Sequence, residues 1–395
     1  MIYLDNAATT KMSKRAIETM VSYMEKVYGN PSSLHSVGQE ANEALTKARE
    51  KMAKLLGCEP REIIFTSGGS EADNQAIISA ARIGQKNAKK HIITTAFEHH
   101  AVLHTLKRLE KEGFEITLLD VHENGLITPK QVEEAIRPDT CLVTIMYANN
   151  EIGTIQPIKE IGEICRAKNV IFHTDAVQVA GHLHIDVKEQ NIDMLSLSAH
   201  KFHGPKGVGA LYAKKGIALT NIIDGGAQER GKRAGTENIP AIMAMAEAFE
   251  EACERQKEKE KKLKALRDKL INGLAQIPHS ILNGDIKHRL YGNVNFCFEG
   301  IEGESLLLLL DDKGIAASSG SACTSGSLDP SHVLLAIGRP HEIAHGSLRL
   351  SLSEENTEEE IDYTIEAVRE VVTYLRSISP VWRDLENGKQ KFVIK

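Results

Sequence analysis

Lys201 lies at a point in the sequence where an amine could become reactive. It follows the apolar run 194–198 within the segment SAHKFHGPKG at 198–207, whose Gly-Pro-Lys-Gly turn bends the chain sharply. A lysine in a half-buried pocket at a strand end loses solvation, so its pKa falls and its amine becomes nucleophilic. Schiff-base chemistry needs an amine of this kind, although a single lysine is more often a surface residue.

The segment TSGGSEADN at 66–74 offers a place for an anion. Gly68 and Gly69 permit a tight turn, and Ser70 followed by Asp73 fits a capping box at the start of a helix. The N–H groups of a helix start attract anions such as phosphate. Gly-Ser is also common before helices that bind no anion, so the segment by itself is weak evidence for phosphate binding.

A third segment, HTDAVQ at 173–178, ends another apolar run and supplies Asp175 and Gln178. A single Asp at this position is also a frequent helix cap. Taken with the anion segment and Lys201, however, it completes the set that pyridoxal phosphate requires. That cofactor needs a phosphate site, a carboxylate that keeps its ring nitrogen protonated, and a lysine for the covalent link.

Cys323 differs from the other five cysteines of the chain. It lies in SSGSACTSG at 318–326, a small, polar, glycine-rich segment in which an exposed and reactive thiol is expected. The other cysteines lie far apart, with no C-x-x-C pair, so neither a zinc site nor a disulfide framework is indicated. We expect them to act as small buried hydrophobic residues.

The composition is that of an ordinary globular protein. The 395 residues are 42% hydrophobic and 26% charged, and 48 basic against 54 acidic residues give a net charge of −6. No basic patch suggests nucleic acid, and the longest apolar run, 306–310, is far shorter than a membrane helix. The N-terminal MIYLDNAATTK shows no export signal, so we expect a cytoplasmic protein.

Short apolar runs alternate with helical segments over about 60–215, which predicts a mainly parallel sheet covered by helices on both faces. The carboxyl ends of such strands form the ligand-binding edge, where the segments described above would meet. The predicted strands are 62–66, 91–96, 115–119, 141–147, 170–174, 194–198 and 207–212, and the helices between them are 70–83, 101–112, 129–135 and 158–168.

From 239 to about 277 the pattern predicts one long helix whose middle, 254–262, is intensely charged. We interpret that run as a solvated face with i,i+4 ion pairs. The apolar residues on either side indicate that the helix leaves one core and enters another. The rest mixes strands at 292–298 and 347–351 with helices at 304–311 and 357–377, typical of a smaller α+β domain.

Ten ordered segments along the whole chain resemble the cysteine desulfurases of the NifS/IscS group, which are fold-type I, class V aminotransferase-like enzymes that use pyridoxal phosphate. These segments are YLDNAATT at 3–10, YGNPSSLH at 28–35, TSGGSEADN at 66–74, EHHAV at 98–102, NNEIG at 149–153, HTDAVQ at 173–178, SAHKFHGPKG at 198–207, RAGTEN at 233–238, SSGSACTSG at 318–326 and SLRLS at 347–351. The resemblance implies a large cofactor domain over 15–255 and a small domain from 1–14 and 256–395 that carries the cysteine loop.

The resemblance also implies residue roles. Lys201 would bind the cofactor covalently, and Asp175 would pair with its ring nitrogen. His99 would stack on the ring, either in that role alone or also as a proton relay. Arg349 would hold the substrate carboxylate, because its planar fork suits that group, with help from Asn30. The other implied cofactor contacts are Gly69, Ser70, Ser198 and His200 at the phosphate, Asn150 and Gln178 around the ring hydroxyl, and Thr236 reaching the phosphate of a neighbouring subunit, which implies a homodimer with shared active sites.

The implied reaction takes sulfur from L-cysteine, releases L-alanine and leaves a persulfide on Cys323. The sulfur would pass to an iron–sulfur scaffold or another acceptor protein, and Cys323 could ligate a transient iron–sulfur cluster with such a partner. The SSGSAC form resembles the branch with a longer cysteine loop. The phosphate segment has Gly69-Ser70 where the family has Ala or Gly followed by Thr, and since the hydroxyl is kept we expect little change.

Other activities remain open at this point. An aminotransferase of the same fold would need no loop thiol, and SSGSACTSG therefore disfavours it. A preference for selenocysteine is compatible with the same residues. A non-catalytic scaffold for iron–sulfur assembly would not need Lys201 and Cys323 together, and a Cys-His hydrolase lacks an identifiable base near Cys323.

Overall fold

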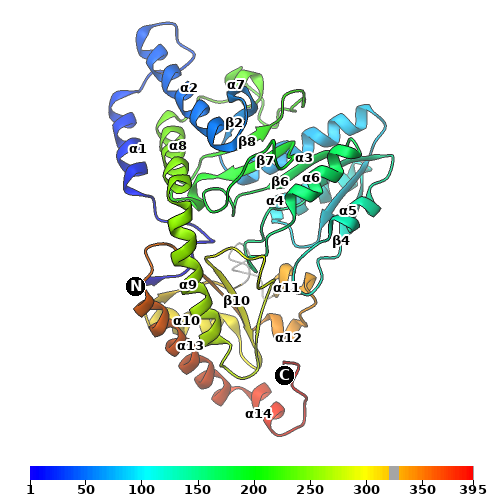
Figure 1. The fold of residues 1–395 in the computed structure, drawn as a ribbon, viewed down its shortest axis with the longest axis vertical. Helices are drawn as coiled ribbons and strands as arrows, with labels where there is room; N and C mark the ends of the chain where they lie inside the picture. The colour runs from blue at the N-terminus through cyan, green and yellow to red at the C-terminus, as the bar shows by residue number, and fades with distance from the viewer. Residues whose placement is uncertain (320–328, 395) are drawn as a thin grey trace.

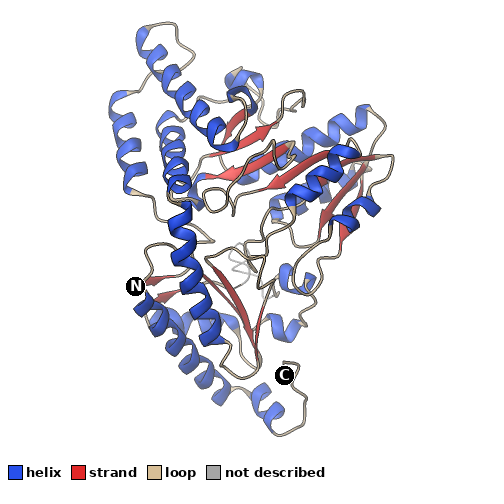
Figure 2. Ribbon diagram, in the orientation of Figure 1, coloured by secondary structure: helices blue, strands red, loops and turns tan. Residues whose placement is uncertain are grey.

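The computed structural model describes residues 1–319 and 329–394, so Cys323 lies outside the described residues. Its largest feature is a seven-stranded, mainly parallel sheet, as predicted (Figures 1 and 2). Only β8 runs antiparallel to its neighbours, β2 and β7. All seven predicted strands are confirmed, with small shifts at their ends; in spatial order they are β2 (Ile63–Thr66), β8 (Gly209–Ala213), β7 (Met194–Ser198), β6 (Ile171–Asp175), β5 (Thr140–Thr144), β3 (His91–Thr95) and β4 (Glu115–Leu119).

Helices cover both faces of this sheet, because alternate side chains along each strand are apolar on opposite sides. Ile64 and Leu142 pack with α3 (Gly69–Lys86) and α4 (His100–Lys111) on one face. Phe65 and Val143 pack on the other face with α2 (Ser36–Leu56), α6 (Ile158–Ala167) and α8 (Ile239–Glu254). Helix α1 (Lys14–Lys26) lies against α8, and the remaining short helices of this part are η1 (Pro60–Glu62), α5 (Pro129–Ala135), η2 (Ala199–Lys201) and α7 (Gln228–Gly231).

The predicted long helix is interrupted. Helix α8 ends at Glu254, Arg255 has φ −93° and ψ 2°, and α9 (Gln256–Leu274) continues in nearly the same direction (Figure 1). The expected change of core along it is confirmed, since Phe249 packs in the core beneath the sheet whereas Leu263 and Leu270 belong to a second core.

The charged run at the junction is not a fully solvated face, as the sequence suggested. Lys259 is buried and its Nζ lies 2.6 Å from Glu354 Oε1. Glu354 also pairs with His203, at 3.4 Å. Since Glu354 follows strand β12 (Ser347–Ser351), this ion pair joins α9 to the segment that leaves β12.

The second core lies under a three-stranded antiparallel sheet, β12-β10-β9, and a two-stranded parallel pair, β1-β11. Leu4, Leu263, Phe296 and Val368 belong to it, so both ends of the chain contribute to one core. The domain boundaries near residues 14 and 255 stay a prediction. The elements of this region are β1 (Ile2–Tyr3), β9 (Ser280–Leu282), β10 (Asn293–Phe298), α10 (Gly303–Asp312), β11 (Ile315–Ala316), α11 (His332–Ala336), α12 (His341–Ala344), β12 (Ser347–Ser351), α13 (Glu358–Ile378) and α14 (Pro380–Glu386).

Among the residues described, no helix combines the length and apolar character needed to cross a membrane.

Candidate active site

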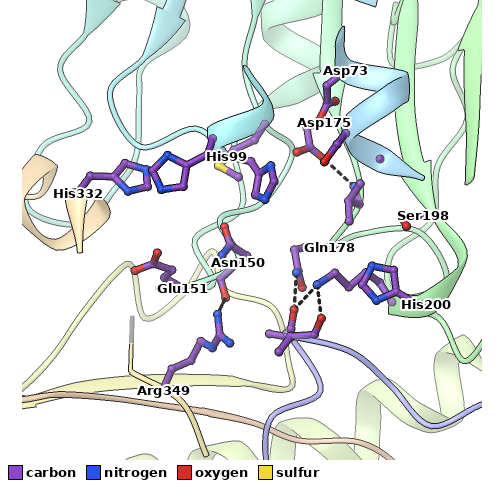
Figure 3. A pocket seen from close by; sticks show the side chains of 18 residues that line it. Asp73, His99, Asn150, Glu151, Asp175, Gln178, Ser198, His200, His332 and Arg349 are labelled. Carbon is purple, nitrogen blue, oxygen red and sulfur yellow. Dashed lines mark hydrogen bonds between the residues drawn. The ribbon is translucent and has the colours of Figure 1, made fainter. Parts of the chain in front are cut away.

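A cavity of about 390 Å³ opens at the carboxyl ends of β3, β5, β6 and β7, with β12 and the N-terminal segment on its other side (Figure 3). This is the sheet edge where the sequence placed the site. Ten of the predicted site residues line it: Gly69, Ser70, His99, Asn150, Asp175, Gln178, Ser198, His200, Lys201 and Arg349.

Lys201 ends the short helix η2 that follows β7, and its amine points into the cavity. Its Nζ donates hydrogen bonds to the carbonyl oxygens of Ala7, at 2.6 Å, and Ala8, at 2.7 Å. Gln178 Nε2 donates to the same Ala7 oxygen, at 2.9 Å. The N-terminal segment therefore positions the amine from a distance of more than 190 residues along the chain, a role that the sequence pattern of YLDNAATT did not reveal.

Asp175 ends β6, and its Oδ1 accepts a hydrogen bond from Val177 N, at 2.9 Å. Burial raises the pKa of its carboxyl, and the neighbouring His99, the Val177 N–H and the Lys201 amine oppose that rise. Figure 3 shows its side chain between His99 and Asp73, so Asp175 presents a buried carboxylate to the cavity rather than acting only as a turn cap.

Asp73 is a second buried carboxyl, and the prediction that it belongs to a capping box is wrong. Helix α3 begins at Gly69, with Gly68 at the N-cap position and no side-chain cap, so Ser70 and Asp73 form no capping box. Asp73 instead lines the cavity, with a side chain only 1% exposed. One polar atom each of Asp73, His99 and Asp175 lies within 4.8 Å of the others.

His99 caps α4, and its Nδ1 accepts a hydrogen bond from Ala101 N, at 3.1 Å. Because Nδ1 is an acceptor there, the neutral ring carries its proton on Nε2. The next residue, His100, packs its ring against His332, with centroids 4.6 Å apart, and against His104, at 5.0 Å. Sequence patterns alone assign no role to these three histidines: His100 lies in the EHHAV segment beside His99, and His104 and His332 lie on helices without a motif of their own.

The part of the cavity at the start of α3 carries groups that can bind an anion. The first turn of α3 leaves backbone N–H groups without intrahelical acceptors, and Ser70, Ser198 and His200 lie around it. Burial, with the charges of Lys201 and Lys206, lowers the pKa of His200 to about 4, so its ring is neutral at pH 7. Gly209 lets β8 lie close to the backbone at the start of α3, because a Cβ at this position would lie 2.7 Å from Gly68 Cα.

Arg349 enters the cavity from β12 and is 1% exposed. Its Nη2 pairs with Asp5 Oδ1 at 2.9 Å, and its Nη1 donates to the carbonyl oxygen of Asn150 at 3.3 Å. Its Nε is buried and has no hydrogen-bond partner among the described residues. A buried guanidinium that still has an N–H without a partner among the described residues suits a small carboxylate ligand.

Two predicted residues lie away from this cavity. Asn30 is exposed in the loop between α1 and α2, where its Oδ1 accepts from Ser32 N at 2.9 Å. Thr236 is exposed in the loop before α8, whose Arg233 pairs with Glu71 of α3 at 2.9 Å. Their predicted roles stay predictions, and for Thr236 the expected role concerns the site of a neighbouring subunit.

Cys323 itself belongs to the residues that are not described, but the flanks of its segment are held at the cavity. Ser318 exchanges two backbone hydrogen bonds with Arg349, at 2.6 and 3.2 Å. On the other side, the Ser331 hydroxyl donates to the Glu151 carboxylate, which lines the cavity. In the sequence, Cys323 follows Ser318 by five positions and precedes Ser331 by eight.

Known proteins share this fold and sequence. The Aminotransferase class-V family matches residues 2–364. The chain is 54% identical over 393 residues to cysteine desulfurase IscS of Clostridium botulinum, covering 99% of each. A solved NifS-like protein is 41% identical, with a TM-score of 0.89 over 95% of this chain and 100% of the other. The structure of SspA in complex with cysteine is 39% identical, with a TM-score of 0.79 over 89% and 99%.

The strand order, the cavity at the carboxyl ends of the strands and these full-length matches agree with one another. The chain belongs to the aminotransferase class-V family and, within it, to the cysteine desulfurases of the NifS/IscS group.

Proposed function

We propose that the cavity binds pyridoxal 5'-phosphate and L-cysteine, and that the chain releases L-alanine while transferring the sulfur to Cys323. The observation that carries this proposal is the convergence, in one cavity, of the Lys201 amine, the Asp175 carboxylate and the Arg349 guanidinium. Each has the chemistry of one part of the reaction: covalent attachment, control of ring charge and recognition of a carboxylate.

The donor set fits the cofactor. The start of α3, with Ser70, Ser198 and His200, offers N–H and O–H groups to a phosphate. Asp175 would pair with the ring nitrogen, His99 would cover the ring, and Gln178 and Asn150 would meet its oxygen substituent. Arg349 Nε, which is buried without a hydrogen-bond partner among the described residues, supports a cavity built to receive a polar ligand.

When bound, pyridoxal phosphate withdraws electrons from the substrate Cα and thereby acidifies its proton. Lys201 Nζ would accept that proton, since the amine is held at the cavity by two carbonyl oxygens. Any proton exchange by His99 would use Nε2, because Nδ1 caps α4. Arg349 would orient the substrate through its carboxylate while Asp5 holds the guanidinium in place.

The Cys323 thiolate would attack the sulfur atom of the bound substrate. A sulfur–sulfur bond forms as the carbon–sulfur bond breaks, and the bonding electron pair stays with the carbon fragment. One proton added at Cβ and one returned to Cα complete L-alanine. The anchoring of Ser318 and Ser331 at the cavity wall supports a role for the segment between them at this site.

We further infer a cytoplasmic homodimer in which Thr236 of one subunit serves the phosphate of the other, with a large domain over 15–255 and a small domain from both chain ends. The exposed position of Thr236, on a loop tied to α3 through Arg233 and Glu71, supports this arrangement. The sulfur would then pass to an iron–sulfur scaffold or another acceptor protein.

The test uses the purified protein loaded with pyridoxal phosphate and supplied with L-cysteine and a thiol reductant. We expect alanine and sulfide in equal amounts. Alanine with no sulfide, or amino transfer to a 2-oxo acid in place of alanine release, would contradict the proposal. L-Selenocysteine in a parallel reaction measures the preference between the two substrates.

A further inference from the structure

Asp73 and Asp175 are two buried carboxyl groups in one cavity, and only Asp175 has a role in the proposed function. One polar atom of each lies within 4.8 Å of the other and of His99 (Figure 3). Two carboxylates this close, both shielded from water, repel each other strongly, so one of them carries a proton at neutral pH. The surroundings of each group decide which one.

Asp175 has the neighbours that favour an anion. The Val177 N–H donates to its Oδ1 at 2.9 Å, and the Lys201 amine nearby favours the charged form of its carboxyl. Asp73 has far less support. Its Oδ1 is buried without a hydrogen-bond partner among the described residues, and Ser196 alone offers it a side-chain hydrogen bond. The proton therefore resides on Asp73.

The groups behind Asp73 agree with this assignment. His173 is fully buried, and burial lowers its pKa to about 3, so it is neutral and supplies no counter-charge, although its Nε2 lies 3.7 Å from Asp73 Oδ1. Its two ring nitrogens bond instead to Thr144 Oγ1, at 2.8 Å, and Ser196 Oγ, at 3.0 Å.

We propose that Asp73 is a positioning residue that stays a neutral carboxylic acid and directs its O–H toward Asp175, so that Asp175 is the single anion beside the cofactor ring. The functional part of this inference rests on the proposed function, since the Asp175 anion would keep the ring nitrogen protonated. The protonation of Asp73 can be measured separately.

The first test is infrared difference spectroscopy of the full-length protein at pH 7, with and without pyridoxal phosphate. Wild type minus Asp73→Asn should show the C=O stretch of a carboxylic acid, shifted in D₂O. Carboxylate stretches in its place would overturn the proposal. Glu98→Gln, measured the same way, identifies the band of Glu98, another buried carboxyl. This result stands whether or not the protein releases alanine and sulfide, so a failure of the proposed function is distinguishable.

The second test separates a hydrogen-bond donor from a merely structural side chain. Asp73→Asn keeps the shape and a donor, whereas Asp73→Val keeps neither polar atom. We expect the valine variant to lower kcat at least about tenfold and to shift the pH dependence of the cofactor's visible absorbance, and the asparagine variant to lower kcat by less than about threefold. Equal losses in both variants would show that Asp73 acts as an anion, and wild-type behaviour of the valine variant would show that it has no role; either outcome overturns the proposal.

Discussion

Arg349 and Asp5 form an ion pair across the cavity wall although 344 positions separate them in the sequence, with Nη2 and Oδ1 2.9 Å apart. The pair joins the last strand of the second region to the N-terminal segment that also holds Lys201. The residue that would recognise the substrate and the residue that would react are thus held by the same short stretch, residues 5–8.

Arg349→Lys should raise the KM for L-cysteine while leaving the cofactor spectrum unchanged. Lysine keeps the charge but cannot present two parallel N–H groups to a carboxylate. Loss of a charged hydrogen bond of about 1.5–3 kcal/mol corresponds to roughly a ten- to hundredfold rise in KM. Steady-state kinetics check this, with the partly exposed Arg255→Lys as control. An unchanged KM would remove Arg349 from substrate binding.

Asp5→Asn should lower the free energy of unfolding, because the guanidinium of Arg349 is 1% exposed and loses its counter-charge. We expect a loss of about 1–3 kcal/mol, the range for a hydrogen bond to a buried charged group. Urea unfolding of both proteins measures it. The exposed ion pair of Lys14 and Glu18 provides the control, since Glu18→Gln should change stability by less than about 0.5 kcal/mol.

Lys201→Ala should abolish the visible absorbance of the cofactor-loaded protein, because no other amine is expected to bind pyridoxal phosphate covalently. Alanine formation should fall to background. Lys206→Ala, which alters an exposed lysine of the same turn, should retain both properties. A band in Lys201→Ala that borohydride still reduces would show that another lysine forms the link.

Cys323→Ala should load the cofactor and change its spectrum on addition of L-cysteine, yet release almost no sulfide. The matched control is Cys58→Ala. Burial raises the pKa of Cys58 to about 12, so its thiolate is scarce at neutral pH and its removal should leave turnover intact. Mass spectrometry of the wild-type protein after one turnover should find the added sulfur on the peptide that contains Cys323. Wild-type turnover by Cys323→Ala would refute the persulfide role.

Glu98 should make the stability of the protein depend on pH. Burial raises its pKa to about 8 in the folded state, with a further contribution from the charge of Asp175. Between the ordinary value near 4.5 and about 8, the folded protein holds a proton that the unfolded chain has lost, so the free energy of unfolding falls as pH rises. Glu98→Gln lacks this proton. Wild type should therefore lose up to about 1.4 kcal/mol per pH unit more than Glu98→Gln between pH 5 and 8. If the free energy of urea unfolding changed with pH by the same amount in both proteins across that range, the assignment of this pH dependence to Glu98 would be wrong.

Local patterns predicted much of the fold and of the cavity. Each strand of the large sheet is a short apolar run, and the position of a residue after such a run places it at the ligand-binding edge. Lys201, Asp175 and Gln178 follow strands in this way, so their convergence could be expected. Where the pattern was ambiguous the predictions failed in detail, as with the break at Arg255 and the buried Lys259, whose partner Glu354 lies 95 positions away.

The sequence alone determined which chemical groups the protein has and which edge of the sheet they follow, because apolar periodicity and strand-to-helix turns are local properties of the chain. Tertiary structure decided what surrounds each group. The pairing of Arg349 with Asp5, the carbonyl oxygens of Ala7 and Ala8 at Lys201, and the placement of Asp73 beside Asp175 all depend on contacts between distant segments. Since burial and neighbouring charge set the protonation of a group, the residue types were readable from the sequence and their states were not.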